Sequence, residues 1–153
     1  MNGHAIMRQA SPIFRKPNLF ERALNKGFGF LVGLGIGLRH NYLVEVTGRR
    51  TGRVYSTPID LMEFKQRRFL VAPRGRTEWV RNAESARELV LKRGSASQKF
   101  RIRIVPDGEK PEILKAYLDR FKLTVQRYFP VRAGADASAF VQIADQYPVF
   151  ELI

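Results

Sequence analysis

Short apolar runs, bounded by glycine, proline or basic residues, dominate the middle of the chain and predict β-strands. The strongest pattern lies in residues 99–104, where three apolar residues alternate strictly with three basic ones, namely Phe100, Ile102 and Ile104 against Lys99, Arg101 and Arg103. Because successive side chains of a strand point to opposite faces, we expect one face of this segment in the core and the other in solvent. Similar runs predict further strands at residues 43–46, 54–64, 69–72, 89–91 and 149–153.

Helical spacing of apolar residues occurs on both sides of these strands. It predicts helices over residues 19–28 and 111–128, and a shorter one over 138–146. Thr77 precedes one more short helix, expected between two strands, and its hydroxyl can cap the first turn. Two prolines interrupt residues 1–18, which are expected to be peripheral or flexible. The order of the elements predicts a mainly β, antiparallel, barrel-like sheet with added helices.

Length and composition agree with a single folded domain over residues 1–153, since chains of this length commonly form one domain with its own core. The hydrophobic content is 44%, with eleven Phe and five Tyr, which excludes general disorder. The chain has no Cys and two His, which excludes thiol chemistry and disfavours a histidine metal site. The longest apolar run, residues 28–38, is too short to cross a membrane, so the expected location is the cytoplasm.

The net charge of +13 is large for this length and is unevenly distributed. Residues 1–103 contain 21 Lys and Arg against 7 Asp and Glu, a net charge of +14, whereas residues 104–153 contain 6 against 7, a net charge of −1. A basic field confined to two thirds of the chain predicts an anionic partner. The candidates are a polyanionic cofactor, a nucleic acid and an acidic membrane surface, the last in contact with residues 19–39.

The best candidate for binding such a partner is the segment Thr47-Gly48-Arg49-Arg50-Thr51-Gly52-Arg53, which lies between two predicted strands. Its glycines permit backbone angles that other residues resist, and the free amides of a turn can point at phosphate oxygens. Each arginine adds a planar fork of donors that matches a phosphate or a carboxylate. The alternative is a solvated hairpin tip that binds nothing, and the residues by themselves leave both interpretations open.

Several segments resemble the deazaflavin-dependent nitroreductase family. They are the run from Leu43 to Pro58 that contains Thr-Gly-Arg-Arg-Thr-Gly, the strand at 69–72, the motif Trp79-Val80-Arg81-Asn82 and the ending Tyr147-Pro148-Val149-Phe150-Glu151-Leu152. The resemblance implies a split β-barrel fold similar to that of FMN-binding proteins. It also implies an oxidoreductase that binds coenzyme F420, a deazaflavin with a phosphodiester and an oligoglutamate tail, with FMN as the second choice. Such enzymes reduce small electron-poor acceptors such as quinones, nitro compounds and conjugated compounds.

The resemblance also implies which residues bind the cofactor. The phosphate and the tail would be held by the basic turn and the start of the next strand, through Arg49, Arg50, Thr51, Gly52, Arg53 and Tyr55. The deazaflavin ring would lie beside Thr57, Pro58 and Ala72. A second basic turn and the helix after it would approach and cover the cofactor, through Arg74, Gly75, Trp79 and Asn82. No catalytic residue is expected, because the cofactor carries the chemistry of hydride transfer. Tyr128 and Phe129 are candidates for an acceptor pocket, although a core role is favoured for both.

Two functions without catalysis are the alternatives. A nucleic-acid-binding module would use the basic turns together with aromatic stacking platforms. We do not expect it, because the apolar face of residues 100–104 is needed for the core. A membrane-peripheral protein would rest residues 19–39 on lipid, and this alternative is compatible with the enzyme. The sequence leaves open the acceptor and the oligomeric state, a homodimer included.

Overall fold

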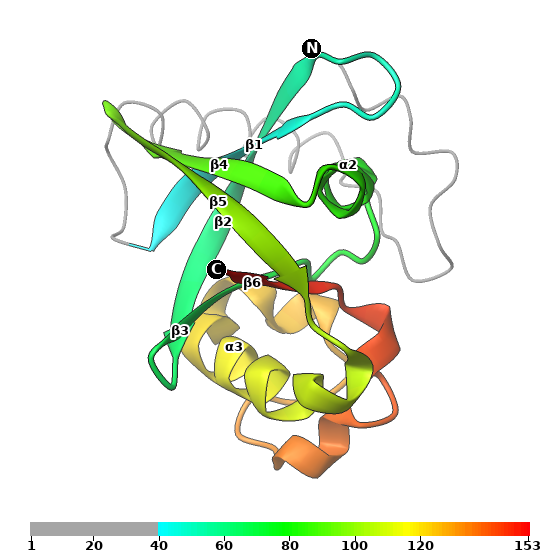
Figure 1. Ribbon diagram of the computed structural model, residues 1–153. Helices are drawn as coiled ribbons and strands as arrows, with labels where there is room; N and C mark the ends of the chain where they lie inside the picture. Colours follow the sequence, from blue (N-terminus) through cyan, green and yellow to red (C-terminus); the bar gives the residue numbers. More distant parts are fainter. Residues whose placement is uncertain (1–39) are drawn as a thin grey trace.

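The computed structural model describes residues 40–153 (Figure 1). The predictions for residues 1–18, 19–28 and 19–39 concern a part of the chain outside this range. Within it, six strands are connected by short turns, helices and 3-10 segments. No helix in this range is long and apolar enough to span a membrane.

The six strands form a closed antiparallel barrel in the order β1-β2-β3-β6-β5-β4. Their bounds are β1 Asn41–Thr47, β2 Val54–Phe64, β3 Arg67–Val71, β4 Glu88–Arg93, β5 Ala96–Ile104 and β6 Val149–Leu152. Each strand predicted within the described range is present, and the mainly β, antiparallel prediction is confirmed. The C-terminal strand β6 lies between β3 and β5, so the last residues of the chain pair with strands that are distant in sequence.

Side-chain alternation divides the core into two parts. In β3, Leu70 points into the barrel, where it faces Phe150 across the β3–β6 register, and both side chains are almost completely buried. Phe69 and Val71 point outward from the same strand and belong to a second cluster outside the barrel. Residues 69–71 of β3 and all of β6 are therefore buried on both faces, whereas Arg101 and Lys99 on the outer face of β5 are exposed.

Helix α3, Lys110–Val125, covers the outward cluster and lies below the barrel in Figure 1. The predicted helical stripe is confirmed, because each of its members is buried: Ile113, Leu114, Tyr117, Leu118, Phe121 and Val125. The helix is kinked at Phe121, and the chain continues as the 3-10 segment Gln126–Tyr128. Phe129, which follows this segment, is buried and stacks on Tyr147 with ring centroids 4.4 Å apart. This position agrees with the core role that the sequence analysis favoured for Phe129.

Two local predictions differ from the structure. Residues 138–146 form two 3-10 segments, Ala137–Phe140 and Ala144–Gln146, where one short helix was expected. A segment this short has little helical stability of its own, so the burial of Phe140 and Ala144 decides its conformation. Thr77 does precede helix α2, Glu78–Ala86, but its hydroxyl makes no capping hydrogen bond and has no partner among residues 40–153.

A network of ion pairs joins the three strands beside the C-terminus. The carboxylate of Glu151 on β6 accepts hydrogen bonds from Arg67 Nε and Nη2 of β3, at 2.7 and 2.8 Å, and from Arg103 Nε of β5 at 2.9 Å. Arg103 also binds Glu109 at 2.8 Å. Glu151 is 8% exposed, and the Arg67 and Arg103 guanidinium groups lower its pKa to about 2, mainly through the hydrogen bonds from Arg67. The network therefore favours a charged Glu151 and strengthens the closure of the barrel.

We predict that Glu151→Gln lowers the free energy of unfolding at pH 7 by about 2 kcal/mol, because hydrogen bonds to a charged group are replaced by weaker ones. Since the pKa of Glu151 is lower in the folded than in the unfolded protein, its contribution is full above the unfolded value near 4.5 and is lost as the pH falls towards about 2. Urea unfolding of both proteins at several pH values measures this.

The matched control is Glu112→Gln, which removes an exposed pair with Lys65 and should cost less than about 0.5 kcal/mol. A difference between Glu151→Gln and the wild type that stayed constant from pH 7 down to pH 2 would contradict the assigned role of the charge.

Candidate functional site

The basic turn between β1 and β2 closes on itself through its backbone. Gly48 N–H donates to the Arg53 carbonyl at 2.6 Å, and Gly52 N–H donates to the Gly48 carbonyl at 2.9 Å. A Cβ on Gly48 would lie 2.6 Å from the Tyr55 ring and 2.8 Å from Thr51 Oγ1, so glycine is required there for close packing. Gly52 has a φ of +74°, which glycine adopts without strain. The two glycines thus serve different purposes in the same turn.

Two hydroxyl groups stabilise the rest of the turn. Thr51 Oγ1 accepts a hydrogen bond from the Arg53 N–H at 3.1 Å and lies 3.1 Å from the Tyr55 hydroxyl. Tyr55 therefore supports the turn from the first residues of β2. Its cross-strand partner is Val46, a barrel residue, so its side chain lies on the inward face of the strand.

Helix α2 holds the turn from the other side. The buried Asn82 accepts two hydrogen bonds at its Oδ1, from the backbone N–H of Arg49 at 3.1 Å and from Arg49 Nη1 at 2.7 Å. The same Nη1 lies 2.9 Å from Glu78 Oε1, and both side chains of this ion pair are about one fifth exposed. Asn82 and Glu78 are four residues apart on one side of α2. We call Arg49, Glu78 and Asn82 the turn clamp.

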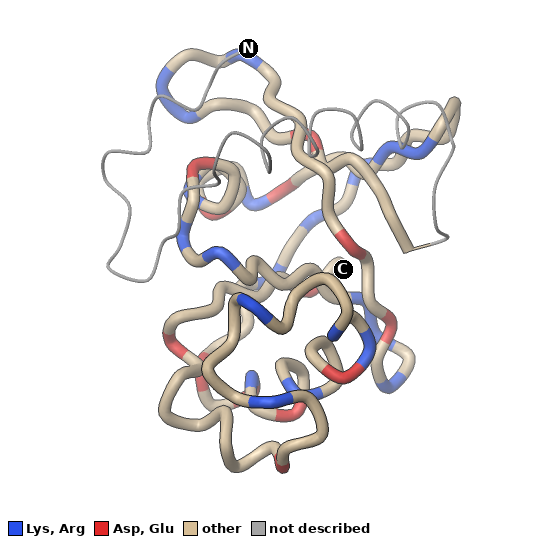
Figure 2. The backbone as a smooth tube through the Cα atoms, turned by 180° about the vertical axis from the view of Figure 1, so that it is seen from behind, with Lys and Arg blue, Asp and Glu red and all other residues tan. Residues whose placement is uncertain are grey.

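The three arginines of the basic turn differ in their contacts. Arg49 is bound to α2, whereas the side chains of Arg50 and Arg53 are exposed and have no ion-pair partner among residues 40–153. Figure 2 shows the basic positions at the tip of the turn and the acidic positions of the neighbouring helix. The turn therefore presents two uncompensated guanidinium groups on a backbone that is already ordered.

The expected ring-binding residues do not all face the same way. Thr57 is opposite the buried Val44 and points to the barrel side of β2, whereas Pro58 is on the outer face, opposite Leu43. Ala72 follows β3, is 3% exposed and belongs to the barrel core. Side chains of these residues cannot all line one surface, so Ala72 could contact a ligand only through its backbone.

The second basic turn, residues 73–76, also leads into α2. Gly75 N–H donates to the Ala72 carbonyl at 3.2 Å, and Gly75 is buried with a φ of +88°. Arg74 is half-buried, and Arg76 pairs with Glu84 at 2.7 Å. Trp79 packs against Phe150 of the barrel core, with ring centroids 5.7 Å apart in an edge-on arrangement. Both basic turns are thus attached to the same helix through ion pairs with its acidic residues.

Sequence reasoning missed Glu78 and did not foresee the contacts of Asn82 with Arg49. Asn82 was expected to cover or support a cofactor, and in the structure it supports the turn that was expected to bind one. Glu78 could have been found as an acidic residue in the first turn of a helix close to a run of arginines. Its pairing with Arg49 depends on a contact between residues 29 positions apart, which the sequence does not reveal.

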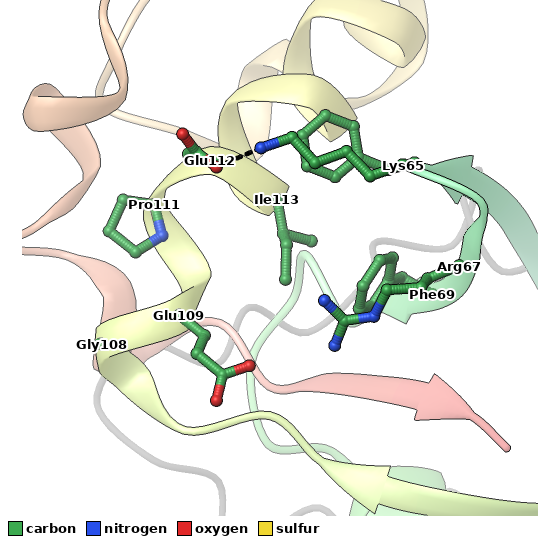
Figure 3. A pocket seen from close by; sticks show the side chains of 9 residues that line it. Lys65, Arg67, Phe69, Gly108, Glu109, Pro111, Glu112 and Ile113 are labelled. Atoms are coloured by element: carbon green, nitrogen blue, oxygen red, sulfur yellow. Dashed lines mark hydrogen bonds and ion pairs between the residues drawn. The ribbon is translucent and has the colours of Figure 1, made fainter.

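A pocket of about 270 Å³ lies elsewhere, between the β2–β3 turn and the start of α3 (Figure 3). Its lining residues are Phe64, Lys65, Arg67, Phe69, Gly108, Glu109, Pro111, Glu112 and Ile113, none of which belongs to the expected cofactor set. Its charged side chains already pair with one another or with Glu151 and Arg103. The described residues contain no cluster of three or more His, Cys, Asp or Glu that could hold a metal ion.

Comparisons with known proteins identify the fold. No protein-family model matches the chain, and no curated protein matches its sequence. Among solved structures, an F420-H2 dependent reductase (FDR-A) is similar with a TM-score of 0.50 and 16% identity, over 75% of this chain and 95% of that one. A protein described as a domain-swapped dimer has a TM-score of 0.53 and 18% identity, over 88% of this chain and 93% of the other.

A third match is Atu2129 from Agrobacterium tumefaciens, a protein of unknown function, with a TM-score of 0.56 and 14% identity over 93% of this chain. This chain spans only 58% of the length of Atu2129. At such identities the likeness concerns the fold alone. It confirms the predicted fold class, a mainly β, antiparallel split barrel of the FMN-binding type.

We predict that Asn82→Ala loosens the basic turn, because the buried amide oxygen is a shared acceptor for the backbone and side chain of Arg49. The amide of Arg49 should exchange with solvent about tenfold faster, which corresponds to about 1.4 kcal/mol. Amide hydrogen exchange followed by NMR measures this residue by residue. Glu84→Gln, which breaks the Arg76 pair at α2, should leave the Arg49 amide unchanged. Equal exchange rates in the wild type and Asn82→Ala would show that the clamp does not order the turn.

Proposed function

We propose that this protein is a split-barrel oxidoreductase that binds the anionic deazaflavin F420 and catalyses hydride transfer to a small electron-poor acceptor. Quinones, nitro compounds and conjugated compounds are the acceptor classes. The observation that carries the proposal is the ordered turn with two exposed arginines, Arg50 and Arg53, which have no acidic partner among residues 40–153. The likeness of the fold to an F420-H2 dependent reductase supports it.

The residues of the turn fit an anionic group. Guanidinium groups on a preformed turn bind phosphate and carboxylate oxygens without a large cost for ordering the loop. In this proposal, Arg50 and Arg53 bind the phosphodiester and the tail, together with the amides of Thr51 and Gly52. Arg49 holds the turn in position through Asn82 and Glu78. This assignment differs from the expectation that Arg49 also holds the phosphate and the tail.

The remaining residues are proposed to surround the cofactor less directly. Tyr55 keeps the turn in shape through Thr51. The ring is proposed to lie along β2 at Pro58, with Thr57 behind it, and near the backbone of the β3–α2 connection. The residues of that connection and of α2 that are proposed to surround the cofactor are Ala72, Arg74, Gly75 and Trp79. The reduced deazaflavin supplies the hydride when bound, so the chain needs to bind, orient and shield the reactants.

FMN is the second candidate for the cofactor, because its phosphate would fit the same arginines. It has fewer negative charges than F420 with its oligoglutamate tail, so it would use less of the basic field of the chain. A homodimer is proposed as the assembly, and the similarity of the fold to a domain-swapped dimer supports it.

We predict that Arg50→Ala with Arg53→Ala weakens binding of F420 by about 2–4 kcal/mol, since each charge-assisted hydrogen bond contributes about 1.5–3 kcal/mol and the two losses are not additive. The dissociation constant would rise by roughly 30- to 1000-fold. Fluorescence titration of the purified protein with F420 measures this, with FMN and a short single-stranded oligonucleotide as parallel ligands.

The matched control is Arg132→Ala, which removes an exposed arginine after α3 and should leave the dissociation constant unchanged. Binding of F420 that the double variant does not weaken would disprove the assignment of Arg50 and Arg53. Binding of the oligonucleotide alone would mean that the turn contacts a phosphate backbone, and the oxidoreductase proposal would then be wrong.

A further inference from the structure

The outer face of β2 runs from α3 to the basic turn, and its residues become more exposed in that direction. Met62 is 1% exposed because α3 covers it, Asp60 is 20% exposed at the side chain, Pro58 is half-buried, Ser56 is exposed and Val54 is 61% exposed. These five residues share one face of the strand by alternation. Asp60 is seven positions after Arg53, a distance of about 23 Å at about 3.3 Å per residue. An elongated ligand with its anionic end at Arg53 would therefore extend towards Asp60.

A histidine–aspartate pair lies where this face of β2 meets α3. His40 Nδ1 is 3.0 Å from Asp60 Oδ1, and Asn41 Nδ2 donates to the same oxygen at 2.6 Å. The same amide nitrogen of Asn41 lies 3.2 Å from His40 Nδ1. Because a carboxylate oxygen accepts hydrogen bonds, we assign a proton to Nδ1, which leaves Nε2 as a second position for a proton. The ring of His40 packs against Phe121 of α3 with centroids 4.8 Å apart, and its side chain is 26% exposed. Orientation and partial exposure are both features that a proton donor requires.

The groups around the pair leave His40 as the residue suited to this task. Burial raises the pKa of Asp60, although its hydrogen bonds to His40 and Asn41 oppose the effect. Burial also raises the pKa of Tyr117 on α3 well above its usual value, so its hydroxyl stays protonated near neutrality. Within residues 40–153, the cations nearby are Arg93 of β4, which binds the Asn41 carbonyl at 2.8 Å, and Arg120, which lies over the Phe121 ring. Imidazole is the side chain that ordinarily exchanges a proton near neutral pH.

We propose that His40, oriented by Asp60 and Asn41, is the catalytic proton donor to the acceptor that is reduced on the outer face of β2. This inference rests on the proposed function. Asp60 is two residues from Pro58 on the same face of the strand, so the pair lies about 7 Å along β2 from the position proposed for the ring. Asp60 and Asn41 are positioning residues, since they act through His40.

The reaction balances for a quinone acceptor. The quinone gains a hydride, with its two electrons, from the reduced deazaflavin and a proton from His40, and becomes a hydroquinone. The Nε2–H bond of the imidazolium breaks as an O–H bond forms on the acceptor, and neutral His40 keeps the Nδ1–H that faces Asp60. His40 then takes a proton from solvent, which balances the proton that the oxidised cofactor releases to solvent.

The experiment uses the fact that the full chain has only two histidines, His4 and His40. NMR of the ¹⁵N-labelled imidazoles, with His4→Gln to assign the resonances, reports on His40 without turnover. Neutral His40 should carry its proton on Nδ1, and addition of oxidised F420 together with a non-reducible quinone analogue should shift its resonances. Asp60→Asn should also shift the resonances of His40, because the contact with the carboxylate is lost.

Turnover gives the second readout. His40→Gln should lower kcat with a benzoquinone by about 100-fold, the range of general acid catalysis, while the dissociation constant for F420 changes by less than about twofold. If the imidazolium donates the proton, kcat of the wild type should fall as the pH rises. This fall should be absent from His40→Gln, whereas the loss of a merely structural role would leave the pH dependence unchanged. His4→Gln is the matched control and should keep both properties.

The outcomes separate this inference from the proposed function. If F420 does not bind the wild type, the proposed function is wrong and the inference is wrong with it. If F420 binds, but the His40 resonances do not shift and His40→Gln keeps the wild-type kcat, the inference alone is overturned. If His40→Gln does not fold, the resonances of the wild type decide the question, because an unshifted imidazole would place His40 away from the reactants.

Discussion

Burial of β3 and β6 on both faces is the constraint on which the rest of the structure depends. Leu70 and Phe150 fill the barrel, while Phe69 and Val149 on the same two strands pack under α3. Burial of a large apolar side chain is worth about 1.5–3 kcal/mol, so neither face can be left in water without a large loss of stability. The barrel and α3 must therefore form together. Glu151 is the charged residue on the outer face of β6, and its carboxylate is stabilised by arginines from both neighbouring strands, β3 and β5.

The same constraint determines where the basic turn lies. Val80 and Ala83 of α2 are completely buried in the barrel cluster, so the helix is fixed in position by its apolar side. Its polar side then presents Glu78 and Asn82 to Arg49. A turn with two glycines and three arginines would otherwise be mobile, because glycine adds conformational freedom and like charges repel. The barrel core thus orders, through α2, a surface whose composition alone favours disorder.

Among the described residues, some arginines form ion pairs that stabilise the fold, and others are exposed without such a pair. Acidic residues neutralise the arginines that hold elements together, such as Arg49, Arg67 and Arg103. Arg50 and Arg53 have no such partner among residues 40–153. A close pair of unneutralised cations on an ordered backbone is unfavourable in isolation and favourable in the presence of an anion. This difference, more than the net charge, distinguishes the turn from the other basic positions of the fold.

The sequence by itself determined the strands, the long helix and the fold class, because alternation and helical spacing of apolar residues are local patterns that tertiary packing preserved at Phe100–Ile104 and Ile113–Val125. It also identified the basic turn, since glycines and arginines define it locally. Tertiary structure alone decided that Arg49 binds α2, that Ala72 points into the core and that residues 138–146 form 3-10 segments. Likewise, His40 and Asp60 are 20 residues apart and meet only because β1 pairs with β2 in one register. Each of these outcomes depends on contacts between distant residues, whose geometry no local pattern encodes.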